Sequence, residues 1–163
     1  MTESTPREEW IKSRPRALLA SCVLMLDGQG RMPLLRHAPG RPDAAQWWLP
    51  GGMLDHGEDP RSRRAGEMRG QTGIDIGPGP ALLGVDRRTD VLGSGPVPDC
   101  FFPGGTMAAD TPVRLSAEHD RHGMVSLDEL HGLPLAARRS TLTALHGVVR
   151  GGGVVYLREG VPL

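Results

Sequence analysis

The chain has 163 residues and a formal net charge of zero, because 19 lysines and arginines balance 19 aspartates and glutamates. This length suits a single domain that buries roughly 70% of its extended-chain surface. The balanced charge offers no basic field to a nucleic-acid backbone, and the apolar run at 17–26 is too short to span a bilayer. We expect a cytoplasmic protein whose partners include neither nucleic acid nor a membrane.

Composition divides the chain into a polar segment at 1–16, a domain at 17–150 and a tail at 151–163, which begins with three glycines. The two cysteines, Cys22 and Cys100, lie in apolar runs that favour strands. Buried thiols are therefore a better interpretation than a disulfide or a metal pair, and a reduced compartment suits them.

A β-hairpin is expected at the start of the domain. Residues 17–26 predict a buried strand, which a turn at 27–30 joins to a return strand at 32–36. Prolines and a glycine make 37–46 a loop, and the apolar stretch at 47–52 ends in a glycine turn.

The clearest helix signal covers residues 60–72. Asp59 can cap the first free amides, Pro60 suits the first helical position, and Gly73 provides a stop. A turn is expected at 77–80.

Further strands, at 81–85, 99–102 and 113–115, would complete a mixed sheet. The capping-box spacing of Ser126 and Glu129 predicts a short helix, and the apolar pattern at 135–149 predicts a terminal helix. The run at 154–157 is expected to add an edge strand or to pair across a homodimer.

The segment at 52–74 resembles the Nudix box, which begins with a glycine, places a glutamate six residues later and ends in a glutamate-rich helix. The matching positions are Gly52, Glu58, Glu67, Met68, Gly73 and Ile74, and the Trp48-Leu49-Pro50-Gly51 lead-in also matches. The similarity covers roughly residues 17–131. It implies one α/β domain, an α/β/α sandwich around a mixed sheet, and an enzyme that hydrolyses a diphosphate-type bond in a small molecule.

Three charged positions of the box are changed: Gly66 replaces the family's arginine, and Gly70 and Gln71 replace its paired glutamates. Positions 67, 70 and 71 share one helix face, where three carboxylates would bind Mg²⁺. The remaining ligands for Mg²⁺ or Mn²⁺ are Glu67 and Gln71, so the resemblance implies a weakened metal site.

Site residues are proposed from this resemblance and from their position. The candidate catalytic residues are Glu67, Glu58, Glu118 and His56, and the candidate substrate-binding residues are Arg36, Trp47, Trp48, Arg64, Gln71 and Arg87. His56 titrates near neutral pH but is also a typical surface histidine. His119 and His122, without a nearby cysteine, form an incomplete zinc set.

Several of these features have a structural alternative. The arginines near Glu67 indicate either a solvated, salt-bridged face, with Arg63 four residues before Glu67, or a direct anion site. Gly66 and Gly70 allow either close packing or room for a bulky substrate. Residues 86–90 form either a turn or a substrate clamp.

Three functions remain open from the sequence. The first is metal-assisted hydrolysis of a diphosphate compound. The second is metal-independent acid/base chemistry, such as isomerisation, cyclisation or hydrolysis of a small biosynthetic metabolite. The third is a non-catalytic module that only binds a ligand.

Overall fold

Two β-sheets form the centre of the computed structural model, which describes residues 6–163 except 78, 80, 81 and 109. The six-stranded mixed sheet has the order β4-β1-β6-β5-β8-β9. Its strands are β1 (Ala20–Leu26), β4 (Gly51–Met53), β5 (Gly84–Arg88), β6 (Val97–Thr106), β8 (Val155–Arg158) and β9 (Val161–Pro162). The three-stranded antiparallel sheet has the order β3-β2-β7 and contains β2 (Met32–His37), β3 (Trp47–Trp48) and β7 (His119–Val125).

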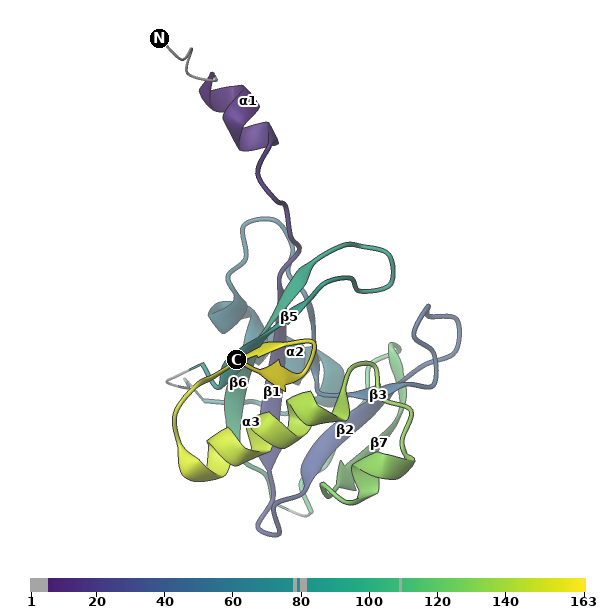
Figure 1. The fold of residues 1–163 in the computed structure, drawn as a ribbon. Coiled ribbons are helices and arrows are strands. Elements are labelled where there is room, and N and C mark those ends of the chain that lie inside the picture. The colour runs from purple at the N-terminus through teal and green to yellow at the C-terminus, as the bar shows by residue number, and fades with distance from the viewer. Residues whose placement is uncertain (1–5, 78, 80–81, 109) are drawn as a thin grey trace.

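The helices are α1 (Arg7–Lys12), α2 (Pro60–Thr72) and α3 (Arg139–Gly151), with a 3₁₀ turn, η1, at Glu129–Gly132. The two long helices lie on opposite sides of the six-stranded sheet, and α1 projects from the body (Figure 1). This arrangement confirms the predicted α/β/α sandwich around a mixed sheet. None of the helices in the described part of the chain is long and apolar enough to cross a membrane.

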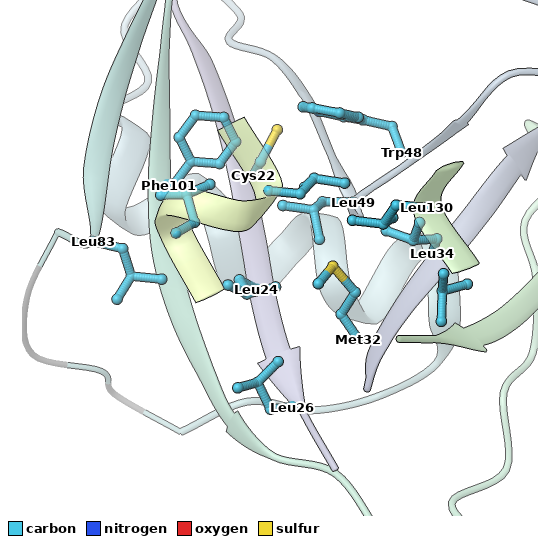
Figure 2. Close-up of a cluster of buried hydrophobic side chains, with 13 residues drawn as sticks. Cys22, Leu24, Leu26, Met32, Leu34, Trp48, Leu49, Leu83, Phe101 and Leu130 are labelled. Atoms are coloured by element: carbon cyan, nitrogen blue, oxygen red, sulfur yellow. The ribbon is translucent and has the colours of Figure 1, made fainter. Parts of the chain in front are cut away.

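Strand β1 is buried on both faces, which explains why its sequence is a continuous apolar run. Leu24 faces a core cluster that includes Met32 of β2 and Leu145 of α3. Val23, on the opposite face, belongs to a second cluster with Met68 of α2. Figure 2 shows the first cluster, with Cys22, Phe101 and Trp48 at one end and Leu26 at the other.

Helix α2 begins and ends where the sequence predicts. The side chain of Asp59 accepts hydrogen bonds from the backbone N–H groups of Arg61 and Ser62, and Pro60 occupies the first helical position. Gly73 ends the helix in the left-handed conformation, with φ of 73°.

Several element predictions need correction. The first strand begins at Ala20, not at 17, and leaves Leu18 and Leu19 exposed. No strand forms at 113–115, because the backbone N–H of Arg114 donates to Thr72 O at the end of α2. The expected strand at 81–85 begins at Gly84, while part of it and part of the 77–80 turn lie outside the described residues.

The expected hairpin at the start of the domain does not form, because β1 pairs with β4 and β6 whereas β2 pairs with β3 and β7 in the other sheet. Two further boundaries differ. The terminal helix begins at Arg139 because the chain before it is extended, with Trp47 N–H donating to Pro134 O and Ala136 N–H to Trp47 O. Strand β7 was not predicted, since its exposed polar side chains break the apolar pattern. The predicted C-terminal strand is β8, which lies between β5 and the two-residue edge strand β9.

Candidate functional site

Two glycines of β4 allow this strand to lie close to strand β1 and to helix α2. A Cβ atom on Gly51 would overlap the backbone of Ser21 and Cys22 in β1. A Cβ atom on Gly52 would lie 3.3 Å from Oε1 of Glu67. The box glycine therefore provides the space in which the carboxylate of Glu67 is held between the helix and the sheet.

Both carboxylate oxygens of Glu67 accept hydrogen bonds from α2 itself. Arg63 Nε donates to Glu67 Oε1 at 2.6 Å, and Gln71 Nε2 donates to Glu67 Oε2 at 2.7 Å. Arg63, Glu67 and Gln71 follow one another at intervals of four residues and therefore lie on one helix face. The predicted Arg63–Glu67 salt bridge forms, but Glu67 is buried, with 6% of its side chain exposed, so the face is not simply solvated.

The amide of Gln71 has a fixed orientation. Its Oε1 accepts a hydrogen bond from the backbone N–H of Gly51 at 3.0 Å, and its Nε2 donates to Gly51 O at 2.9 Å. A flipped amide would place N–H against N–H and oxygen against oxygen. Gln71 therefore presents a hydrogen-bond donor to Glu67, while its oxygen is occupied by the backbone.

Two of the other predicted carboxylates join the same network. Glu58 Oε1 lies 3.0 Å from Arg63 Nη1, so the guanidinium of Arg63 bridges Glu58 and Glu67. Glu118 Oε2 lies 3.4 Å from Gln71 Nε2, and Glu118 Oε1 lies 3.3 Å from Arg41 Nη1. The structure thus brings together three of the four proposed catalytic residues.

Burial raises the pKa of Glu67, and Arg63 opposes this shift by hydrogen bonding and charge. Glu118 and Glu58 add smaller repulsive contributions that also raise this pKa. The positive charge of Arg63 therefore stabilises the ionised form of a carboxylate that its surroundings disfavour.

The oxygens of Glu67 and Gln71, which are the predicted metal ligands, are engaged in hydrogen bonds within the chain. Both oxygens of Glu67 accept hydrogen bonds, and the oxygen of Gln71 is bound to the backbone of Gly51. Among the described residues, no cluster of three or more His, Cys, Asp or Glu side chains is arranged to hold a metal ion. The guanidinium of Arg63 lies between the carboxylates of Glu58 and Glu67 and pairs with both.

The two unusual glycines of α2 are not explained by packing. Gly66 and Gly70 are exposed, and a Cβ atom on either would meet nothing within 4 Å. The close-packing interpretation is therefore wrong. The exposed face around Gly66 borders a shallow depression next to Glu58, Ser62 and Arg63.

The remaining predicted residues lie in different places. His56 is on an exposed loop, and Arg36 forms a two-pronged ion pair with Asp120, with distances of 2.8 and 2.6 Å. Arg64 is buried and donates to Gly77 O at 3.0 Å. Burial lowers the pKa of Arg64, and the charge of Arg61 adds to this effect. Neither Arg64 nor the exposed Arg87 lines the main cavity.

A cavity lined by Gly51 and Gly52, which we call the main cavity, has a volume of about 220 Å³ and is more enclosed than the depression beside Gly66, whose volume is about 290 Å³. Its apolar wall includes the buried Trp48, whereas Trp47 packs beside the core cluster. The polar groups in its wall were not proposed as site residues: His37, Arg41, Asp43, Gln46, Arg88 and Asp99.

The sequence did contain a signal for Asp99. Val97, Asp99 and Phe101 alternate along β6 and are all buried, so the carboxylate points to the same face as two core side chains.

The turn interpretation of 86–90 is wrong for its first half, because residues 86–88 belong to β5. Arg88 is the arginine of this segment that reaches the cavity.

Solved structures of hydrolases share this fold. A MutT protein from Methanosarcina mazei Go1 is 26% identical, with a TM-score of 0.68 over 85% of this chain and 96% of that chain. By its fold, the chain belongs to the Nudix hydrolase superfamily. A NUDIX hydrolase from Nitrosomonas europaea is 18% identical, with a TM-score of 0.68 over 85% of this chain and 93% of that one. A UDP-X diphosphatase is 19% identical, with a TM-score of 0.69 over 94% of this chain and 76% of that one.

No family model matches the sequence, and no curated protein matches it either. The Nudix relationship is therefore carried by the fold, together with the box glycines and glutamates described above.

Proposed function

We propose that the chain is a Nudix-fold enzyme that performs acid/base chemistry on a small organic metabolite in the main cavity, without a bound divalent metal. The observation that carries this proposal is the guanidinium of Arg63, which bridges Glu58 and Glu67 at 3.0 and 2.6 Å. The positive charge of Arg63 offsets part of the negative charge that these two carboxylates would otherwise present to a metal ion.

The carboxylates have different roles in this proposal. Glu67 is buried and hydrogen-bonded through both oxygens, so it holds Arg63 and Gln71 in place. Glu118 is more than half exposed, and its contacts to Arg41 and Gln71 are long, at 3.3 and 3.4 Å. Arg41 also lines the cavity, and its contact with Glu118 supports our proposal that Glu118 exchanges protons with a bound substrate.

A second candidate function is metal-assisted cleavage of a diphosphate bond. The convergence of Glu58, Glu67 and Glu118 on one network favours it. Solved neighbours also include a protein named as an ADP-ribose pyrophosphatase from Streptococcus suis and one named as a UDP-X diphosphatase. This function requires a metal to displace Arg63 from two carboxylates.

Two assays separate these functions. In the first, ADP-ribose and UDP-sugars are offered to the natural chain with Mg²⁺, Mn²⁺ or EDTA, beside a Gly70→Glu, Gln71→Glu variant. A Gly70→Gln variant is the matched control, because it adds a similar side chain without charge. We expect no metal-dependent cleavage by the natural chain, and such cleavage would refute the metal-independent proposal.

In the second assay, the natural chain is incubated with a metabolite extract in EDTA, and mass spectrometry identifies compounds that are consumed. We expect Glu118→Gln to lower turnover of such a compound by at least about 100-fold, as loss of a general acid or base does. Undiminished turnover by Glu118→Gln would remove Glu118 from the mechanism.

A further inference from the structure

Two buried carboxylates lie opposite each other on neighbouring strands, but their surroundings differ. Asp86 of β5 pairs in register with Asp99 of β6. Asp86 accepts hydrogen bonds from Thr141 Oγ1 at 2.6 Å and from the backbone N–H of Gly160 at 3.1 Å. Asp99 has one long contact, 3.4 Å from its Oδ2 to Arg88 Nη1, and its Oδ1 has no hydrogen-bond donor among the described residues.

Asp99 and Arg88 both line the main cavity, and Asp99 is 4% exposed. Arg88 is held in place by a second hydrogen bond, from its Nη2 to Ala136 O at 3.1 Å. Cys22, Trp48 and Leu49 form apolar wall nearby. The pair is therefore a fixed polar group beside the apolar part of the cavity wall, as in sites that orient a ligand through polar contacts.

Oδ1 of Asp99 lacks a protein donor among the described residues and Asp99 lines the cavity, so a bound ligand can supply a hydrogen bond to this oxygen in place of water. Burial raises the pKa of Asp99 to about 6, while the charge and hydrogen bond of Arg88 oppose the shift and Asp86 adds repulsion. Asp99 is therefore largely ionised at pH 7 and accepts hydrogen bonds. Arg88 donates hydrogen bonds immediately beside it.

We propose that Asp99 and Arg88 recognise a planar substrate group that carries an N–H donor beside a C=O acceptor, such as a lactam or a primary amide. The N–H donates to Asp99 Oδ1, and the C=O accepts from the guanidinium of Arg88. This assignment depends on the proposed function in one respect, which is that the main cavity is the substrate site. It adds a substrate class and two specificity residues to that site.

The test measures binding of two small probes to the natural chain in EDTA, by NMR titration of backbone and indole N–H signals. One probe is 2-pyridone, which has adjacent N–H and C=O groups, and the other is 1-methyl-2-pyridone, which lacks the N–H. We expect 2-pyridone to bind at least about tenfold more tightly, because a site built around a hydrogen bond rejects an analogue that leaves it unpaired. Equal affinities, or no binding of either probe, would overturn the proposal.

Asp99→Asn assigns the preference to this residue. Arg88 attracts the oxygen of the introduced amide, which turns the amide N–H₂ toward the cavity and against the ligand N–H. We expect the preference to disappear while 1-methyl-2-pyridone binds as before, which also shows that the cavity remains intact. Leu92→Ala is the matched control, because Leu92 lines the cavity but is exposed and apolar.

An unchanged preference in Asp99→Asn would overturn the assignment to Asp99. The natural chain alone still decides whether the N–H is recognised, so a variant that fails to fold does not prevent a refutation. Neither a metal nor turnover enters these measurements. Metal-dependent cleavage would refute the proposed function but leave the probe preference standing, so the two failures are distinguishable.

Discussion

Replacing Arg63 by methionine removes the guanidinium that joins Glu58 and Glu67. Arg63 Nε lies 2.6 Å from an oxygen of Glu67, whose side chain is 6% exposed, whereas Arg63 itself is 32% exposed. Removing one partner of a fully buried pair costs about 3–5 kcal/mol, and a hydrogen bond to a charged group contributes about 1.5–3 kcal/mol. The partial exposure of Arg63 places the expected loss in free energy of unfolding at about 2 kcal/mol at pH 7.

The expected loss depends on pH with a defined sign. Burial already raises the pKa of Glu67, and loss of Arg63 raises it further, since Arg63 opposes the shift. In the variant, the native state therefore binds a proton at Glu67 more readily than the unfolded chain does. Its loss relative to the natural chain should be small at pH 5 and should grow as the pH rises to 8.

Urea unfolding at pH 5 and pH 8 measures both effects. Arg69→Met is the matched control, because Arg69 lies on the exposed side of α2 and its nearest ion-pair contact, 3.6 Å to Asp75, is solvent-exposed. We expect no measurable change in that control. In a double-mutant cycle with Glu67→Gln, the double variant should lose at least about 1 kcal/mol less stability than the sum of the two single losses. Equal losses for Arg63→Met and Arg69→Met, or additive losses in the cycle, would refute the bridging role of Arg63.

Three further predictions concern stability. Gly70→Ala should raise the free energy of unfolding by about 1 kcal/mol, since the added Cβ meets nothing within 4 Å. Gly51→Ala should lower the free energy of unfolding, because the added Cβ overlaps the β1 backbone. Thermal melts that rank the two variants in the reverse order would contradict this packing. Burial raises the pKa of Asp99 from 3.8 to about 6, so the natural chain should lose about 2 kcal/mol of stability relative to Asp99→Asn as the pH rises from 4 to 6. Parallel pH profiles of the two chains would exclude this. Burial lowers the pKa of His119 from 6.5 to about 4. The stability that the neutral imidazole contributes is therefore complete above pH 6.5 and is lost as the pH falls toward 4. This loss of stability should be absent in His119→Gln.

The parts of the fold that sequence predicts are those encoded locally. Helix α2 has its cap, its proline and its terminal glycine within 15 residues, so both ends were predicted correctly. The start of α3 was wrong because a tertiary contact decides it: Trp47 exchanges backbone hydrogen bonds with Pro134 and Ala136, and so extends a segment whose local pattern favours helix. The strand prediction at 113–115 was wrong for the same reason, since the backbone N–H of Arg114 donates to Thr72 O at the end of α2.

The candidate site divides in the same way. The spacing of Arg63, Glu67 and Gln71 predicts a shared helix face, and their contacts follow from that spacing. The sequence does not show that Gly51 fixes the amide of Gln71, because the two residues are 20 positions apart. Nor does it show that Asp99 lies beside Arg88, which depends on the β5–β6 register.

The two carboxylates on either side of the β4 glycines explain how a Nudix fold can keep its cleft after its box helix has lost charge. Glu67, on the helix side, has both oxygens occupied by donors from its own helix and so contributes to structure. Asp99, on the cavity side, is buried with an oxygen that lacks a donor among the described residues. A group that accepts its hydrogen bonds from a ligand is one whose environment improves on binding. In the substrate recognition that we propose, strand β6 therefore provides a polar contact directly to the organic part of the substrate.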